Sequence, residues 1–163
     1  MSQLTRLIEV DDSIAAQFAG TRPWTLRLAE GFPRQEDRVG MAGRERGATN
    51  FLIVHAGEVV GTCGTHGSIT AEGPVELGWG LVEQARGRGV GTSAVIELVD
   101  VIRARAPRAT LCATTEWIVS DGTAAPVSPA SEAILRRLGF AAGEIPSSAG
   151  VRTWVLATSS RAQ

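Results

Sequence analysis

The sequence predicts a mixed α/β fold, in which a mostly antiparallel sheet contains one parallel pair of strands. Two observations lead to this class. Residues 51–69 have the pattern of an antiparallel hairpin, and residues 73–116 follow the order strand, loop, helix, strand. A strand that returns through a helix lies parallel to its predecessor, so a single parallel crossover is expected. With 163 residues, 44% of them hydrophobic, the chain should form one domain over 1–163.

The first half of the chain is predicted to begin with a strand, LTRLIEV, at residues 4–10. The polar segment that follows should hold one or two short helices, near 12–18 and 34–46. In the hairpin at 51–69, the turn His-Ala-Gly-Glu connects two apolar strands. The strand at 73–82 has two interior glycines, which indicate a bulge or a close approach of the backbone.

A helix is predicted next, at about 91–106, and it carries one apolar stripe at helical spacing. The stripe is formed by Val95, Leu98, Val99 and Ile102. Pro107 ends this helix, and the apolar segment 109–116 is predicted to be the strand that returns parallel to 73–82.

A polar loop containing glycine and proline is expected over 117–127. The second helix should begin at Ser128-Pro129, because serine is a preferred N-cap and proline suits the first helical position. Gly139 ends this helix. The last strands are predicted at 140–141 and 151–158.

Composition excludes several classes of function. The net charge of −1 and the pI of about 6.1 lack the basic excess of a nucleic-acid or membrane-surface binder. No apolar run reaches the roughly 18 residues that a membrane span needs. The N-terminus, MSQLTRLIEVDDS, has acidic residues where a signal peptide would be apolar. We therefore expect a soluble, cytoplasmic protein without nucleic-acid or membrane partners.

Missing residue types narrow the chemistry further. All 16 basic residues are arginine, and without lysine the chain can form neither a Schiff base nor a P-loop. There is no tyrosine to act as a general acid. Cys63 and Cys112 lie in apolar segments without CxxC spacing, so both are predicted to be reduced thiols. His55 and His66 are too few and too isolated to predict a metal site.

The stretch EQARGRGVGTSAV, residues 83–95, has three glycines and two arginines directly before a predicted helix. Such a loop suits an anion, because glycines let the anion approach the backbone and the N–H groups at a helix N-terminus are unpaired. Nucleotide, dinucleotide, nucleic acid and coenzyme A are the four ligands to weigh. The missing lysine excludes a nucleotide held by a P-loop, and the absence of interleaved aromatic residues disfavours nucleic acid.

The dinucleotide alternative rests on a match to the GxGxxA pattern from Gly89 to Ala94, with Glu116 at the end of the next strand. Two features count against it. A six-residue loop separates Val82 from Gly89, and the strands before the loop are antiparallel. Coenzyme A fits better, because Arg86, Gly89 and Gly91 have the spacing of a pyrophosphate loop.

The segment VELGWGLVEQARGRGVGTSAV, followed some 35 residues later by SPASEAILRRLGF, resembles the GNAT superfamily of acyl-CoA N-acyltransferases. It is most similar to the branch of ribosomal-protein N-terminal acetyltransferases. The resemblance covers about residues 51–142 and implies the GNAT fold, in which two parallel strands splay apart and helices cover both faces of the sheet. It also implies direct acetyl transfer from acetyl-CoA to a primary amine, on a small molecule or a peptide N-terminus.

The resemblance implies a set of contacts with the donor. The pantetheine arm would pair with the backbone of Leu81 and Val82, and an N–H near Leu81 would polarise the thioester carbonyl. Arg86 and Arg88 would supply positive charge. The pyrophosphate would bind to the backbone of the loop, at Gly87, Arg88, Gly89, Val90, Gly91 and Thr92.

The resemblance also implies catalytic positions, and here the sequence departs from the family. Glu76 occupies the acidic position of the family's Glu-Leu-Gly-Trp pattern and is the candidate general base. Ser128 replaces the usual asparagine of the second motif. Leu135 stands where many members have a tyrosine that acts as general acid. Ser131 or water is then left to protonate the departing thiolate. These losses keep open an alternative, a non-catalytic acyl-CoA-binding module; a nucleotide-dependent oxidoreductase is a weaker third hypothesis.

The acceptor is not identified by the sequence. Trp117 and Asp121, in the loop after the parallel strand, are candidate contacts, and so are Trp24 and Phe32 in the region of the first helices. Acidic residues in that same region would suit a cationic amine, and they are Glu30, Glu36 and Asp37. The oligomeric state is equally open, although the resemblance makes a homodimer one of the states to test.

Overall fold

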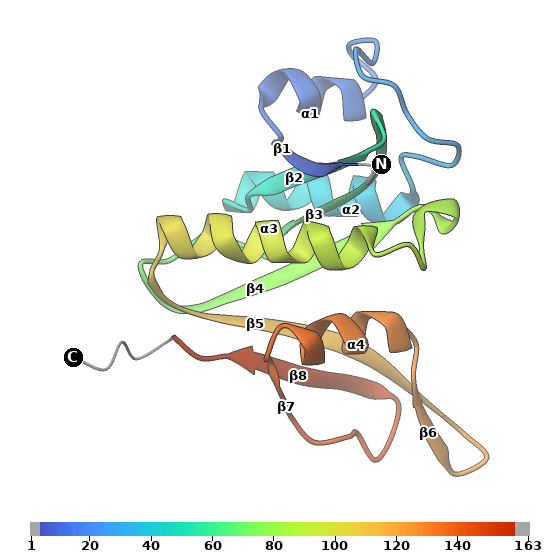
Figure 1. Ribbon diagram of the computed structural model, residues 1–163, viewed down its shortest axis with the longest axis vertical. Coiled ribbons are helices and arrows are strands. Elements are labelled where there is room, and N and C mark those ends of the chain that lie inside the picture. The colour runs from blue at the N-terminus through green and yellow to red at the C-terminus, as the bar shows by residue number, and fades with distance from the viewer. Residues whose placement is uncertain (1–3, 159–163) are drawn as a thin grey trace.

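The computed structural model describes residues 4–158, and it consists of one twisted sheet with helices on both faces (Figure 1). The order of strands is β1-β2-β3-β4-β5-β8-β7, with β6 also paired to β5. The strands are β1 (Thr5–Glu9), β2 (Asn50–His55), β3 (Glu58–Thr65), β4 (Glu72–Leu81), β5 (Arg108–Ser120), β6 (Thr123–Pro126), β7 (Ala141–Ala142) and β8 (Gly150–Leu156). The helices are α1 (Asp12–Phe18), α2 (Gln35–Ala42), α3 (Val90–Arg105) and α4 (Pro129–Arg137), with short 3₁₀ turns at Gly43–Arg46 and Glu83–Ala85.

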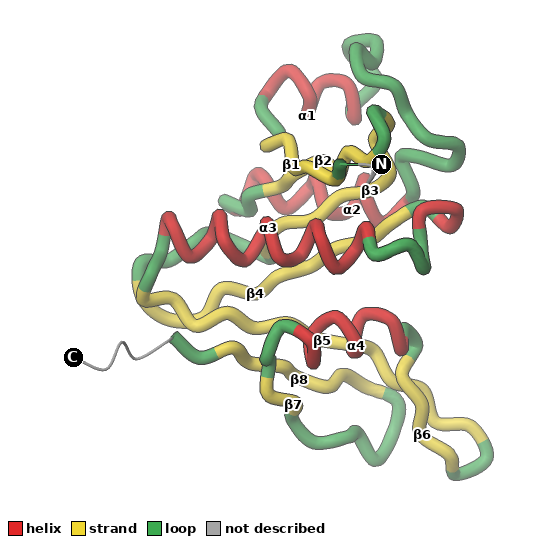
Figure 2. Tube along the Cα trace, viewed as in Figure 1, coloured by secondary structure: helices red, strands yellow, loops and turns green. Residues whose placement is uncertain are grey.

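One parallel pair interrupts an otherwise antiparallel sheet, as predicted. β4 and β5 pair in parallel from Glu72 opposite Arg108 to Glu76 opposite Cys112. Beyond Glu76, β4 stays paired with β3 on its other side as far as Leu81. The two parallel strands therefore splay apart in their second halves, and Figure 2 shows the separation between the ends of β4 and β5. The predicted fold class is confirmed.

The two faces of the sheet carry different helices. Thr62 of β3 donates a hydrogen bond of 2.5 Å to Asp37, which lies on α2. Leu81 of β4 approaches Gly91 at the start of α3, on the opposite face. Figure 1 shows α3 lying across the first half of the sheet and α4 lying over β5 and β8.

The two interior glycines of β4 make room for side chains rather than for a bulge. The pairing of β3 with β4 is regular, and the irregularity recorded in the first strands lies between Ile53 and Val54. A Cβ atom at Gly78 would lie 2.3 Å from Nε2 of His66. A Cβ at Gly80 would lie 2.3 Å from a guanidinium nitrogen of Arg34. Both glycines thus admit a side chain onto the α2 face of β4.

The loop predicted over 117–127 is a β-hairpin instead. β5 continues to Ser120, and β6 pairs back onto it from Ser120 opposite Thr123 to Trp117 opposite Pro126. The turn is Asp121-Gly122, whose φ angles of 51° and 74° are both left-handed. Asp-Gly is a strong signal for such a turn, and the polar composition of the segment obscured it.

Candidate functional site

A cavity of about 730 Å³ lies where β4 and β5 splay apart. β4, the glycine loop, β5, α2 and α4 all contribute to its walls. The residues that line it are Arg34, Glu36, Trp79, Gly80, Leu81, Arg86, Gly87, Gly89, Gly91, Thr92, Thr114, Thr115, Glu116, Val127, Ser128, Ala130, Ser131, Ala133, Ile134 and Arg137. The cavity therefore joins the predicted anion loop to the predicted second motif.

The register of β4 decides which backbone groups face this cavity. The N–H of Val82 donates to the carbonyl of Val60 (2.8 Å), and that of His66 donates to Glu76 (2.9 Å). In an antiparallel pair, hydrogen-bonded and non-bonded positions alternate. The even-numbered residues of β4 therefore bond to β3, and the N–H groups of Trp79 and Leu81 point toward β5. These two groups form the open strand edge in the gap.

This register corrects one predicted contact. The N–H of Val82 donates to β3, and the carbonyl of Val82 accepts a hydrogen bond from the N–H of Ala85 (3.1 Å). Val82 therefore has no free backbone group with which to bind a pantetheine arm in the gap. The backbone of Trp79, rather than that of Val82, is the second one that can bind the pantetheine arm beside Leu81. The alternation could have been derived from the sequence only if the pairing of β3 with β4 had been known.

The glycine loop presents backbone donors at the end of the cavity. Gly87 and Gly89 have φ angles of 71° and 79°, in the left-handed region that favours glycine. Gly89 is the N-cap of α3, and no side chain caps this helix. The first N–H groups of α3 therefore remain for an anion, and the 16-residue helix adds the positive end of its dipole.

Two guanidinium groups meet at the end of β4. Arg86 donates through Nε to the carbonyl of Leu81 (3.1 Å), and Arg34 donates through Nη1 to the same oxygen (3.2 Å). Arg34 is also held by the buried carboxylate of Asp37, with Nη2 2.8 Å and Nε 2.9 Å from its oxygens. The charge of Arg34 is thereby matched, whereas the terminal nitrogens of Arg86 remain for a ligand.

The N-terminus of α4 brings two hydroxyl groups into the cavity. Ser128 caps the helix, because its Oγ accepts a hydrogen bond from the backbone N–H of Ser131 (3.2 Å). The Ser128 hydroxyl also donates to Oγ of Ser131 (2.9 Å). The proton of Ser131 is then the one left to point at a ligand. Leu135, where the family resemblance would place tyrosine, is fully buried in the core.

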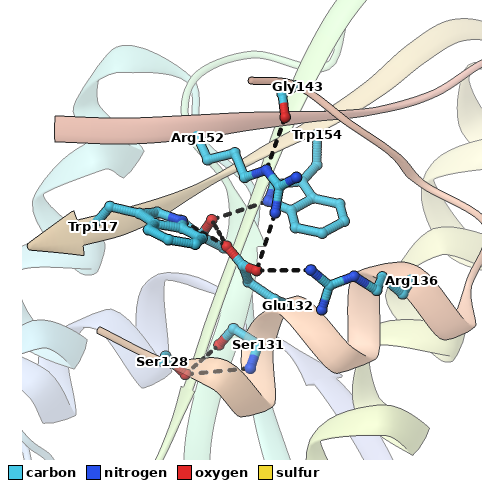
Figure 3. Close-up of polar contacts among 9 residues, drawn as sticks. Trp117, Ser128, Ser131, Glu132, Arg136, Gly143, Arg152 and Trp154 are labelled. Atoms are coloured by element: carbon cyan, nitrogen blue, oxygen red, sulfur yellow. Dashed lines mark hydrogen bonds and ion pairs between the residues drawn. The ribbon is translucent and has the colours of Figure 1, made fainter. Parts of the chain in front are cut away.

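A buried polar network fixes α4 on the sheet (Figure 3). Glu132 is only 2% exposed, yet its carboxylate accepts hydrogen bonds from Thr115 (2.9 Å) and from the indole of Trp117 (2.7 Å). Arg136 and Arg152 lie 3.2 and 3.4 Å from its other oxygen. The network extends to Trp154, whose indole N–H donates to Thr115 and whose ring packs against both arginines.

The face of the splayed strands that points away from α4 is partly exposed. Glu76 accepts a hydrogen bond from the hydroxyl of Thr114 (3.0 Å) and lies opposite Cys112. Glu116 lies two residues beyond Thr114 on the same face, and both line the cavity. Partial burial, and next the charge of Glu76, raise the pKa of the Cys112 thiol. Glu76 does not line the cavity itself, so it can act on a bound amine only through water or another group.

The structure brings together half of the site residues expected from the sequence. Eight of them line the cavity: Leu81, Arg86, Gly87, Gly89, Gly91, Thr92, Ser128 and Ser131. The side chain of Val90 is buried in the core, and Arg88 is exposed outside the cavity.

The predicted acceptor contacts lie elsewhere. Trp24 and Phe32 pack edge to face against Phe18, with ring centroids 4.9 and 5.8 Å away. Trp117 belongs to the Glu132 network, and Asp121 lies in the hairpin turn. Asp37 is fully buried, which removes it from the acidic set that was expected to face an amine. A role in acceptor binding stays a prediction for these residues, and the geometry gives it no support.

Several lining residues escaped the sequence analysis, and among them are Arg34, Trp79, Thr114 and Arg137, whose signals in the sequence were weak. Arg34 has no motif around it, and Thr114 is one of many threonines. Trp79 is the last residue of the Glu-Leu-Gly-Trp pattern, which gives it no role of its own. Arg137 lies in the last turn of α4, where a basic residue is ordinary. Arg137 nevertheless lines the cavity and adds a second exposed cation beside Arg86.

Two features of the described part, residues 4–158, bear on other classes of site. No helix there is both long and apolar enough to cross a membrane. The same residues contain no group of three or more histidine, cysteine, aspartate or glutamate side chains arranged to hold a metal ion.

Comparison with known proteins agrees with this geometry. Residues 4–141 match the family profile described as an acetyltransferase (GNAT) domain, which confirms the family expected from the two motifs. No curated protein sequence matches the chain.

Similar solved structures include several N-acetyltransferases. A ribosomal L7/L12 α-N-protein acetyltransferase, RimL, in complex with coenzyme A shares 16% identity, with 94% of this chain and 93% of that one covered and a TM-score of 0.59. A ribosomal-protein-S5-alanine acetyltransferase from Vibrio fischeri shares 16% identity over the full length of both chains, with a TM-score of 0.60. Campylobacter jejuni PseH in complex with acetyl coenzyme A shares 14% identity over 96% and 100% of the chains, with a TM-score of 0.59.

Proposed function

We propose, on the premise that this chain belongs to the acetyltransferase (GNAT) domain family, that it transfers an acetyl group from acetyl-CoA to a primary amine. The single observation that carries the proposal is the gap between β4 and β5. It combines an open strand edge, an uncapped helix N-terminus and two hydroxyl groups in one cavity. A linear thioester with a phosphorylated end would use all three.

Donor binding follows from the shape of the cavity. The pantetheine arm would lie along β4 and pair with the backbone of Trp79 and Leu81 as an added strand does. The pyrophosphate would accept hydrogen bonds from the loop between Gly87 and Thr92. Arg86 and Arg137, both exposed and both lining the cavity, would add charge-assisted hydrogen bonds. Structures of RimL with coenzyme A and of PseH with acetyl coenzyme A support the choice of donor.

Acetyl transfer would be direct. The amine nitrogen forms a bond to the carbonyl carbon, and the bond from that carbon to sulfur breaks. Negative charge that develops on the carbonyl oxygen would be stabilised by the N–H of Leu81 or Trp79, which is fixed in place by the sheet. The departing thiolate would accept a hydrogen bond from the hydroxyl of Ser131, whose hydrogen is free because Ser128 already donates to its oxygen, and water would supply the proton that the thiolate takes up. A thiol with a pKa of about 8.5 leaves without a strong acid.

The amine must lose a proton before it attacks. Glu76 is the proposed general base, in line with its place in the family pattern, and it would act through water because it lies outside the cavity. The acceptor would approach from the exposed face of β5, past Thr114 and Glu116. Ribosomal-protein N-termini and small amines both remain acceptors to test, since the named neighbours include enzymes for ribosomal proteins.

A screen for release of free thiol from acetyl-CoA tests this function. The panel should contain short peptides with different N-termini, polyamines and free amino acids. We expect turnover with at least one primary amine and little with its N-methylated tertiary counterpart. Glu76→Gln should lower kcat on that amine and leave the affinity for coenzyme A unchanged, as measured by calorimetry.

A second candidate, an acyl-CoA-binding module without turnover, is favoured by one observation. In many family members, a tyrosine that acts as general acid occupies the position of Leu135. Leu135 is fully buried and has no acidic group, so no general acid can act from there. Tight binding of acetyl-CoA without thiol release across the whole panel would support this alternative and exclude the proposed transfer.

A further inference from the structure

β5 has an open edge of its own, which faces β4 across the gap. Cys112 pairs with β4 on one edge and with β8 on the other, and Trp117 pairs in the same way with β6 and β8. β6 therefore lies on the edge of β5 that β4 has left. Between these two pairings, residues 113–115 have no neighbouring strand on that edge within the described part of the chain, 4–158. We call these three residues the β5 window.

The hydrogen bonds around the β5 window show which of its residues faces the gap. On the β6 edge, the N–H of Val127 donates to the carbonyl of Glu116 (2.9 Å). Backbone groups of successive residues in a strand point to opposite edges, so the even-numbered residues of β5 face the gap. The other edge agrees, because Gly143 donates to Thr153 (2.7 Å) and the even-numbered residues of β8 are thus left for the odd-numbered residues of β5. Both the N–H and the C=O of Thr114 therefore point into the gap.

The β5 window belongs to the wall of the cavity. Thr114 lines this cavity, and so do Glu116 and Val127 where the β6 hairpin closes the window (Figure 2). Trp79 and Leu81 present the open edge of β4 to the same cavity, and the pantetheine arm is proposed to pair with them. The open edge of β5 is then left for the second substrate. One free N–H and one free C=O on the same residue are the groups with which a strand binds one residue of an added extended chain.

An apolar surface lies beside the β5 window, on the face of the sheet away from α4. Figure 1 shows α4 against the other face of β5 and β8. Ile118 has its side chain on the same face of β5 as Thr114 and is 53% exposed. Val151 of β8 lies opposite Glu116, points to that face as well and is 57% exposed. A chain paired with Thr114 would therefore have an apolar side chain of its own beside Ile118 and Val151.

We propose that the acceptor is the N-terminal segment of a polypeptide in extended form, and that the backbone of Thr114 binds its second residue. This assignment rests on the proposed acetyl transfer. The first nitrogen of the acceptor is the nucleophile, so the second residue is the first one with both an amide N–H and a C=O to pair. Its N–H would donate to the C=O of Thr114, and its C=O would accept from the N–H of Thr114. An amine without a peptide bond makes neither contact.

Peptides altered in their backbone test this contact without any change to the protein. The probes are the tetrapeptide amide Ala-Val-Ala-Ala and two derivatives, one N-methylated on the second residue and one on the fourth. The first methyl group removes the N–H that would bond to Thr114, so kcat/KM in the thiol-release assay should fall by about tenfold. The methyl group on the fourth residue makes the same chemical change beyond the β5 window, and it should leave kcat/KM close to that of the unmodified peptide.

A pair of exposed valines tests the apolar surface. Val151→Asn should lower the preference for Ala-Val-Ala-Ala over Ala-Gly-Ala-Ala, measured as the ratio of their kcat/KM values, by about threefold, because apolar contact with the second side chain is lost. Val39→Asn makes the same change on α2, where Val39 is 63% exposed, and should leave this ratio unchanged. An unchanged ratio in Val151→Asn would overturn the placement of the second side chain on this surface.

Amide hydrogen exchange, resolved by NMR, shows which substrate covers Thr114. Coenzyme A alone should leave exchange at the Thr114 amide unchanged, since the arm of the donor lies on β4. Coenzyme A together with Ala-Val-Ala-Ala amide forms a complex that cannot react, and in it the Thr114 amide should be protected. The amide of Thr115 faces β8 and should be equally slow in all three states. Protection of Thr114 by coenzyme A alone would give the β5 window to the donor and overturn the proposal.

Failure of this assignment can be told apart from failure of the proposed transfer. Equal values of kcat/KM for the two N-methylated peptides would overturn the contact with Thr114 and leave the transfer reaction standing. Faster turnover of a polyamine or a free amino acid than of any peptide in the panel would do the same. A wild type without turnover on any amine would overturn the proposed transfer, and this assignment with it.

Discussion

The two faces of β5 differ in how completely their polar groups are engaged. On one face, Thr115 is buried under α4 and bonds to Glu132, which accepts four partners in all. On the other face, the adjacent Thr114 is exposed, and its hydroxyl donates to Glu76. The first face is a fixed support that positions α4 and its two serines. The second face stays open, as the approach of an acceptor requires.

The largest effect should come from the fixed face. Glu132→Ala removes a buried carboxylate and leaves the Trp117 indole and the Thr115 hydroxyl without their acceptor, while Arg152 keeps its bond to the carbonyl of Gly143. Breaking a buried ion pair in this way costs about 3 kcal/mol of unfolding free energy. Urea denaturation followed by tryptophan fluorescence measures this loss. A change below about 0.5 kcal/mol would mean that the Glu132 network does not hold α4.

The two neighbouring threonines provide a matched pair of variants. Thr115→Val should destabilise the fold by about 1–3 kcal/mol, because Glu132 and the indole of Trp154 each lose a buried partner. Thr114→Val changes the same atoms on the exposed face and should alter stability by no more than about 0.5 kcal/mol. Equal losses in both variants, measured by the same denaturation experiment, would contradict the contrast between the faces.

The donor loop offers a second matched pair. Arg86→Ala should raise the KM for acetyl-CoA by about tenfold with little change in kcat, since about 1.4 kcal/mol of charge-assisted binding is lost. Arg88→Ala, two residues away and outside the cavity, should change the KM much less. A larger effect at Arg88 would show that the pyrophosphate lies on the other side of the loop.

The smallest effect concerns the thiol on the open face. Burial raises the pKa of Cys112, and the charge of Glu76 raises it further. Glu76→Gln removes the charge, so the pKa should fall, more thiolate should be present at a given pH, and alkylation by iodoacetamide should be faster. Mass spectrometry can follow this rate for each cysteine. Cys63 is buried, and burial raises its pKa strongly, so it serves as the unreactive control.

The donor side of the site could be predicted from the sequence better than the acceptor side. The donor side rests on backbone conformation, and the glycines of the loop and the Ser-Pro start of α4 leave clear local signals. Half of the expected site residues lie in the cavity for that reason. The parallel pair and the helix boundaries were predicted from periodicity and caps.

The acceptor side depends on long-range register, which no local pattern reveals. Arg34 reaches the gap only because Gly80 leaves space above β4, and the backbone of Thr114 faces the gap only in the register found here. Aromatic residues near the first helices looked available to an acceptor, but Trp24 and Phe32 pack against Phe18. Polar composition likewise hid the Asp121-Gly122 hairpin turn.

Amide hydrogen exchange with and without coenzyme A, resolved residue by residue by NMR, tests the central claim most directly. If the arm of the donor pairs with the open edge of β4, coenzyme A should slow exchange at Trp79 and Leu81 and at the loop from Gly87 to Thr92. Gly80 and Val82 already bond to β3 and should change little. Protection at Gly80 and Val82 instead, or no protection in the loop, would contradict binding in the gap between β4 and β5.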